Sequence, residues 1–280
     1  MNRTILSVIG VTAIAVTLLF IFTLGNLRQS TTDNDSPGKS GRAVASASRL
    51  KMFAGAGLRK AVEALEAEFE KQSGIELDVD YAGSGIAISR AREDKTADLF
   101  MPGDVWYVDR LQELTGNVIE KTPVSYFIPV IIVQKGNPKN IRGLSDFLRK
   151  DVTAAMGNPD ACQIGRLMKK IFKKNGLDYE QIDPKLSLTV NELGVWVKMK
   201  NVDMSVVWDA IAENIKDSTD KIMIPPTENI ISRVVVGRLK TSKHPEAARK
   251  FVRFLQSPEA RAILRKKGYT VDLPDEYKKG

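Results

Sequence analysis

The chain has 280 residues, of which 43% are hydrophobic, and it carries a formal net charge of +8. The hydrophobic share is ample for a packed core, and the basic residues are spread along predicted helices instead of clustering with aromatic ones, which argues against a nucleic-acid partner. The single cysteine rules out an internal disulfide, and the single histidine leaves the chain poorly equipped for covalent catalysis. We therefore expect a binding protein that needs no cofactor, and not an enzyme.

The N-terminus contains an apolar run at 5–25, with no charge between Arg3 and Arg28. About 20 such residues can cross a bilayer, and no suitable cleavage pattern lies close behind the run. We therefore predict that 1–27 is an uncleaved membrane anchor of a periplasmic or other extracytoplasmic protein, with a cleaved signal peptide as the alternative. Residues 28–48 are rich in small and polar residues and are predicted to form a flexible linker.

After the linker, short strands alternate with helices. Residues 50–54 form a short apolar strand, and the apolar stripe within 58–72 is typical of an amphipathic helix. Apolar residues alternate along 75–81, which indicates a second strand, and a second helix follows it. This order predicts an α/β fold with a parallel, doubly wound sheet, which binds ligands at the carboxyl ends of its strands.

Each of these two strands is followed by a turn of small residues, Gly-Ala-Gly at 55–57 and Gly-Ser-Gly at 83–85. Glycine lets the chain turn sharply, and the backbone N–H groups at the start of a helix stabilise an anion. A plain strand–turn–helix junction with Ser84 as the helix N-cap explains the second turn equally well. Two such turns on consecutive strands can nevertheless converge on one compact anion.

A third loop of this kind occupies 157–165, between a predicted strand at 151–156 and a predicted helix at 166–174. Further strands are expected at 186–190 and 204–208, and a helix is expected to begin at Leu193. The length of the chain after the linker allows either one large domain or two lobes.

Several carboxylates follow the predicted strands. Oxygen ligands of this kind can bind a metal ion, and each carboxylate can equally well cap the helix that follows it. Two interpretations are therefore kept: a metal site that uses Asp160 and Glu192, and helix capping by each carboxylate. The carboxylates are Asp98, Asp104, Asp160, Glu192 and Asp209.

In order and spacing, five segments are similar to the periplasmic molybdate-binding proteins, which are type II solute-binding proteins of ABC importers. The resemblance extends over about 50–270. It implies two lobes, each a doubly wound and mostly parallel sheet, joined by two crossover strands at a hinge. The crossings are then expected near Tyr126 and Pro225, between a first lobe of 49–125 plus 227–280 and a second lobe of 126–226. It also implies a monomer that captures a small inorganic anion, molybdate or tungstate, for an ABC permease in the inner membrane. The segments are 53–58, 81–85, 97–104, 155–165 and 206–209.

The resemblance also implies where the ligand binds. That family usually has a serine in both first-lobe turns, so Ser84 keeps one hydroxyl, whereas Gly57 can offer only its N–H. Second-lobe amides are expected near Ile164, and Trp208 stands where a tyrosine is usual. Fe(III) or another metal cation, sulfate or phosphate, and a membrane-anchored hydrolase are the alternatives. The expected ligand-binding residues are Ala56, Gly57, Gly83, Ser84, Asp160, Ile164, Gly165, Leu193 and Trp208.

Overall fold

The computed structural model describes residues 49–278. The predicted anchor at 5–25 and linker at 28–48 lie outside the described residues. Within 49–278, no helix is both long enough and apolar enough to span a membrane.

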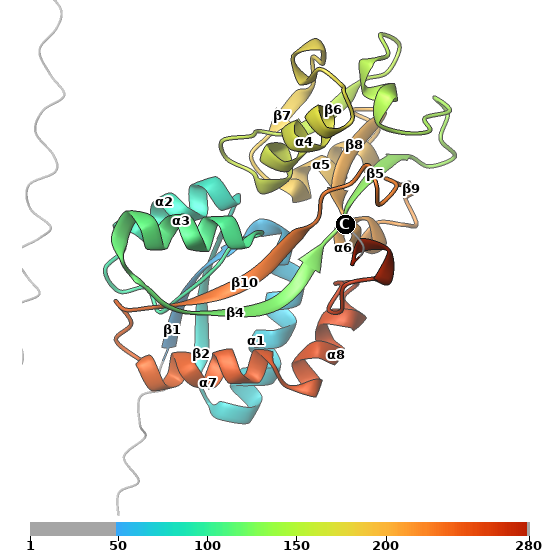
Figure 1. Cartoon of the computed structure of the whole chain (residues 1–280). Helices are drawn as coiled ribbons and strands as arrows, with labels where there is room; N and C mark the ends of the chain where they lie inside the picture. The colour runs from blue at the N-terminus through green and yellow to red at the C-terminus, as the bar shows by residue number, and fades with distance from the viewer. Residues whose placement is uncertain (1–48, 279–280) are drawn as a thin grey trace, which may run out of the picture. The chain divides into compact units, whose positions relative to one another are not determined.

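Two five-stranded sheets form the framework of the described residues (Figure 1). The first sheet has the strand order β2-β1-β3-β10-β4. Strands β1, β2 and β3 are parallel to one another, whereas β10 runs antiparallel to both of its neighbours. These strands are β1 (Arg49–Gly55), β2 (Glu76–Ala82), β3 (Leu99–Met101), β4 (Val118–Phe127) and β10 (Ser232–Leu239).

The second sheet repeats this plan with the order β7-β6-β8-β5-β9. Here β6 is parallel to β7 and β8, and β5 is antiparallel to β8 and β9. The expected two-lobe α/β fold is confirmed. In each sheet four of the five strands run in one direction, and only β10 or β5 runs against them, so the expected mostly parallel sheets are confirmed as well. The strands are β5 (Pro129–Gln134), β6 (Ala154–Gly157), β7 (Lys185–Ser187), β8 (Met204–Trp208) and β9 (Thr219–Met223).

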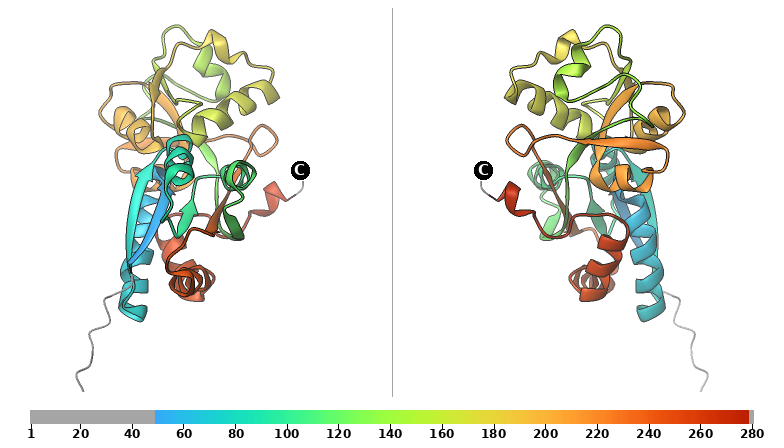
Figure 2. Two further views of the ribbon diagram at one scale, coloured as in Figure 1. Left: turned by 90° about the vertical axis from the view of Figure 1, so that its left-hand side faces the viewer. Right: turned by 90° about the vertical axis from the view of Figure 1, so that its right-hand side faces the viewer.

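Helices cover both faces of the first sheet. Side chains alternate along β1, so Met52 packs with α1, α7 and α8 on one face, while Phe53 packs with α2 and α3 on the other. Figure 2 shows α7 and α8, in orange-red, at the end of this lobe remote from the second lobe. The helices are α1 (Arg59–Ser73), α2 (Ser84–Glu93), α3 (Val105–Thr115), α7 (Pro245–Leu255) and α8 (Pro258–Lys266), with a 3-10 turn η1 (Ala56–Leu58) before α1.

The second lobe encloses its sheet in the same way. Residues 130–133 of β5 are fully buried, as expected for a strand whose two faces are both covered. The elements around this sheet are η2 (Leu144–Leu148), α4 (Gln163–Lys174), η3 (Tyr179–Gln181), α5 (Val190–Lys198) and α6 (Asp209–Asn214). A further 3-10 turn, η4 (Asp275–Tyr277), lies near the C-terminus.

The chain passes between the sheets twice, after β4 and before β10, and a buried carboxylate ties the crossing region together. Asp209 accepts hydrogen bonds from the Ile128 N–H at 3.2 Å and from the Thr270 hydroxyl at 2.6 Å. The Tyr126 N–H in turn donates to the Thr270 carbonyl at 2.7 Å. Burial raises the pKa of Asp209, against the effect of these hydrogen bonds. Thr270 of the C-terminal segment is therefore bonded both to Tyr126 in β4 of the first lobe and to Asp209 in α6 of the second lobe.

Candidate ligand-binding cavity between the lobes

A small cavity lies where the turns of both lobes meet. Its volume is about 20 Å³, slightly more than one enclosed water molecule needs. Six of the nine predicted ligand-binding residues line it, and no lining residue has a charged side chain. The lining residues are Gly55, Ala56, Gly57, Gly83, Ser84, Gly103, Phe127, Cys162, Gln163, Ile164, Val190 and Trp208.

Gly57 contributes its backbone to the first-lobe side of this cavity. It is the second residue of η1, so its N–H has no partner within that turn. A Cβ at this position would lie 2.9 Å from Trp208 Cδ1 and 3.0 Å from Val190 Cγ1. Glycine at position 57 therefore has a steric role. The Trp208 indole occupies the space that a serine side chain would need.

Ser84 is the first residue of α2, and the N-cap is Gly83, so the alternative prediction of Ser84 as the cap is wrong. The Ser84 side chain is buried, and its Oγ accepts a hydrogen bond from the Gly103 N–H at 3.0 Å. This bond uses the acceptor capacity of the hydroxyl and leaves its hydrogen to be donated. The Gly85 N–H, by contrast, donates to the Ala161 carbonyl at 3.0 Å and is not available to a ligand.

The glycines of this turn also allow the two lobes to touch. A Cβ at Gly83 would lie 2.3 Å from the carbonyl oxygens of Ala161 and Leu188, and one at Gly85 would lie 2.0 Å from the Asp160 carbonyl oxygen. Real Cβ atoms do not approach backbone atoms so closely. The Gly-Ser-Gly sequence therefore serves the contact between the lobes as well as the turn itself.

The second-lobe side is formed by the starts of α4 and α5, and both helices begin earlier than predicted. α5 begins at Val190, since the Thr189 hydroxyl caps it by accepting from the Glu192 N–H at 3.4 Å. Val190 consequently lines the cavity, whereas Leu193, predicted to do so, is a core residue that does not line it. The Thr-x-x-Glu pattern at 189–192 is a capping-box signal that could have placed this start correctly.

α4 begins at Gln163, three residues before its predicted start. Gln163 was not predicted as a site residue, yet it is buried and lines the cavity, and its Nε2 donates to Ser232 Oγ at 2.9 Å. Gly165 instead packs against β6, because a Cβ there would lie 2.0 Å from the Gly157 carbonyl oxygen. Cys162, also not predicted, lines the cavity as the N-cap of α4.

The two proposed metal-ligating carboxylates do not line the cavity. Asp160 lines a wider groove of about 290 Å³ between α2, α3 and the second lobe. Glu192 accepts a hydrogen bond from the Ser187 hydroxyl at 2.5 Å. Asp104 caps α3 by accepting from the Trp106 N–H at 2.9 Å, so capping is confirmed for this carboxylate. Across 49–278 there is no group of three or more His, Cys, Asp or Glu residues that could hold a metal ion.

Side chains join the lobes on two sides of the cavity. The Arg166 guanidinium of α4 lies 4.0 Å from the centre of the Trp106 ring of α3 and 3.8 Å from Asp104 Oδ1. Asn191 Nδ2 of α5 donates to the Ala56 carbonyl at 3.0 Å. Together with the bond from Gly85 to Ala161, these contacts show a closed arrangement of the two lobes.

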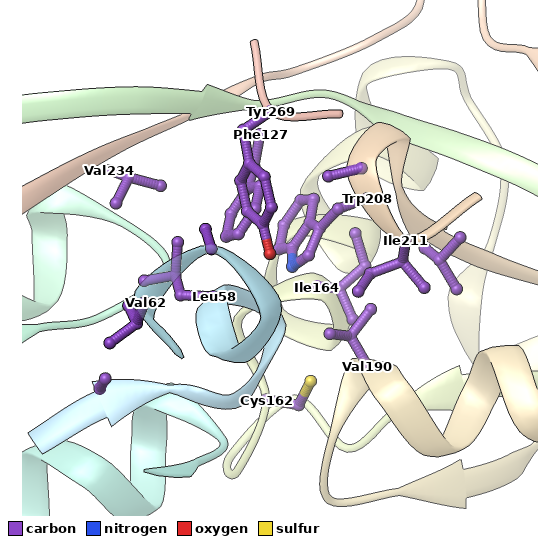
Figure 3. Close-up of a cluster of buried hydrophobic side chains, with 14 of the residues drawn as sticks. Leu58, Val62, Phe127, Cys162, Ile164, Val190, Trp208, Ile211, Val234 and Tyr269 are labelled. Atoms are coloured by element: carbon purple, nitrogen blue, oxygen red, sulfur yellow. The ribbon is translucent and has the colours of Figure 1, made fainter. Parts of the chain in front are cut away.

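Trp208 is the largest side chain at the cavity. It is 2% exposed and stacks on Phe127 with ring centres 4.7 Å apart and planes 3° apart (Figure 3). Nearby, the Tyr269 hydroxyl donates to the Gly57 carbonyl at 2.5 Å. The hydrogen bonds found among residues 49–278 include none from Trp208 Nε1. The indole N–H is therefore a donor without a partner in a residue that lines the cavity, and a ligand can use it.

Residues 50–270 match the family model described as bacterial extracellular solute-binding protein. The chain belongs to this family. A protein of Haemophilus influenzae named only as a binding protein is 27% identical to this solute-binding protein over 226 residues, which are 80% of this chain and 91% of that one. The molybdate-binding protein ModA of Mycobacterium bovis is 23% identical over 223 residues, which are 79% of this chain and 84% of that one.

Solved structures share the fold of this solute-binding protein. The sulfate-binding protein SubI of Mycobacterium tuberculosis has a TM-score of 0.70 and 18% identity, over 83% of this chain and 90% of that one. The periplasmic molybdate-binding protein of Azotobacter vinelandii has a TM-score of 0.67 and 17% identity, over 80% of this chain and 100% of that one. At these identities the likeness establishes the fold alone.

Proposed function

We propose that this solute-binding protein captures a tetrahedral oxyanion, with molybdate or tungstate as the preferred ligand, and presents it to an ABC permease. The observation that carries the proposal is a small cavity between the lobes that is lined by hydrogen-bond donors and by no charged side chain. An anion accepts hydrogen bonds, which a metal cation cannot do, and the N–H groups at the starts of helices favour negative charge. A cavity of this kind suits an anion held by neutral dipoles.

The size of the cavity supports a compact ligand. Pockets for organic ligands typically measure roughly 300–1,000 Å³, whereas this cavity measures about 20 Å³. The choice of molybdate over sulfate is supported by the names of the relatives, among which molybdate-binding proteins recur. An ABC permease as the partner is supported by a relative from Bacillus subtilis, whose name describes an ABC transporter substrate-binding lipoprotein. The membrane anchor and the monomeric state stay predictions, and intact-mass measurement of the native protein tests the first.

Calorimetric titration tests the proposal, with molybdate, tungstate, sulfate, phosphate and Fe(III) as separate ligands and a melting curve for each. We expect saturable binding of molybdate or tungstate and a raised melting temperature, because a ligand at 100 times its Kd adds roughly 2.7 kcal/mol to the free energy of unfolding. Binding of Fe(III) alone, or binding of none of the oxyanions, would overturn the proposal.

A further inference from the structure

We propose that the Cys162 thiol contacts the bound anion and determines which oxyanion the cavity selects. This inference rests on the proposed function and concerns the same cavity. On the second-lobe side of the cavity, where backbone amides alone were expected to meet the ligand, the Cys162 thiol would meet it too.

The position of Cys162 is the first observation. It is the N-cap of α4, it is 4% exposed, and it lines the cavity with Ser84 and Trp208. The sulfur lies beside Gly157 at the end of β6, in space that a side chain would need, since a Cβ at Gly157 would lie 3.1 Å from it. The thiol is thus held at the boundary between the second lobe and the cavity.

The starts of two helices lie around this cysteine. The N–H groups of Ile164 and Gly165 at the start of α4 and of Val190 at the start of α5 act to lower the pKa of its thiol. The first N–H groups of a helix have no partner within it and form its positive end. The amides that should meet an oxyanion from the second lobe therefore face sulfur first.

A second, independent observation indicates that a ligand enters this space. The Trp208 indole is 2% exposed and lines the same cavity, yet within the described part of the chain its Nε1 donates no hydrogen bond. In Figure 3 this nitrogen lies on the edge of the ring nearer to Ile164 and Cys162. Nε1 is not one of the fully enclosed polar atoms that lack a partner, so the cavity reaches it, and a bound oxyanion would accept its hydrogen bond.

The protonation state of the thiol suits contact with an anion. Burial raises the pKa of Cys162 to about 11, although the three amides act in the opposite direction. A neutral thiol can donate its S–H weakly to an oxyanion oxygen, whereas a thiolate would repel it. The sulfur also takes up volume that a larger anion would otherwise fill, so it affects both the donors and the space available.

Labelling with a maleimide is the first test, since Cys162 is the only cysteine in the chain. We expect a saturating oxyanion to slow the labelling at least about tenfold, and the labelled protein to lose oxyanion binding, because the adduct fills the cavity. The control is Leu186→Cys in a Cys162→Ala protein, which moves the thiol to a side chain that is 50% exposed on β7. Its labelling should not respond to the oxyanion. Unchanged affinity in protein labelled at Cys162 would overturn the inference.

Selectivity is the second test, because a purely structural cysteine would change all affinities together. In Cys162→Ala the three amides and the sulfur volume become available, so the ratio of molybdate to sulfate affinity should rise about tenfold, a typical effect of one hydrogen bond to a charged partner. Cys162→Ser keeps a hydrogen-bond donor at this position. Its ratio of molybdate to sulfate affinity should therefore lie between those of the unmodified protein and of Cys162→Ala. An unchanged ratio in Cys162→Ala would contradict the inference. Absence of oxyanion binding in the unmodified protein would instead refute the proposed function.

Discussion

The first-lobe and second-lobe sides of the cavity differ in what covers the starts of their helices. In the first lobe, the Gly57 N–H and the Ser84 hydroxyl reach the cavity with no side chain between them and a ligand. In the second lobe, the first amides of α4 and α5 face the Cys162 sulfur. The local plan, a strand followed by a short turn and a helix, is the same in both lobes. Topology therefore determines where amides converge, and single side chains determine whether a ligand can use them.

A second difference concerns the space that glycine leaves on each side. First-lobe glycines admit second-lobe atoms, namely the Trp208 indole beside Gly57 and two carbonyl oxygens beside Gly83. The second-lobe Gly165 instead admits backbone atoms of Gly157 and Asn158, which belong to its own lobe. Gly57 and Gly83 are therefore required for the two lobes to come into contact, whereas Gly165 is required for packing within the second lobe.

The largest effect on oxyanion affinity is expected for Gly83→Ala. Unchanged affinity in this variant would contradict the view that the first-lobe turns are shaped by contact with the second lobe. The alanine Cβ would meet two second-lobe carbonyl oxygens at 2.3 Å, and overpacking costs about 1–3 kcal/mol or more. Oxyanion affinity should fall about a hundredfold or more by calorimetry, because only the closed form contains these contacts. Gly143→Ala is the matched control, since a Cβ there meets nothing within 4 Å.

Gly57→Ser should weaken binding about tenfold to a hundredfold, although it adds the hydroxyl that the resembling family has at this place. The new Cβ would lie 2.9 Å from an indole that is stacked on Phe127 and cannot easily shift. Calorimetry on this variant and on Gly57→Ser combined with Trp208→Tyr separates size from donor effects. Recovery in the double variant supports the fit between positions 57 and 208, and unchanged affinity in the single variant would contradict it.

Ser84→Ala tests whether the first-lobe hydroxyl serves the ligand or only the Gly103 amide. Loss of a hydrogen bond to a charged partner costs about 1.5–3 kcal/mol, so affinity should fall about tenfold or somewhat more. If the hydroxyl serves only Gly103, the melting temperature without ligand should fall and the affinity should stay level. A melting curve beside the titration distinguishes these results.

The smallest effect on binding is expected for Asp94→Asn, outside the cavity. Burial would raise the pKa of Asp94, but hydrogen bonds from Lys51 and Thr96 outweigh it and lower this pKa to about 2. The lowered pKa stabilises the fold above the unfolded pKa of about 3.9, and this contribution is lost as the pH falls towards 2. The melting temperature should therefore fall between about pH 4 and pH 2 in the native chain and less in the variant. Equal oxyanion affinity at pH 7 would show that stability and binding are separate.

Much of the fold could be predicted from local patterns. The alternation along β2, the apolar stripe of α1 and the glycine turns are signals within a few residues, and the structure has the predicted elements with ends shifted by a few positions. The start of α5 was missed although a local signal existed, since Thr189 and Glu192 form a capping pattern. For that reason Leu193 was expected at the cavity in place of Val190.

The order of strands, turns and helices by itself determined the α/β class and the convergence of small-residue turns, because both follow from residues close together in the chain. Only the tertiary structure decided which groups face the cavity. Gly57 meets Trp208, 151 positions later, and the Gly85 amide is taken by Ala161, 76 positions later. Such contacts leave no periodicity in the sequence, because they depend on the distance between two lobes and on the volume of the side chains that fill it.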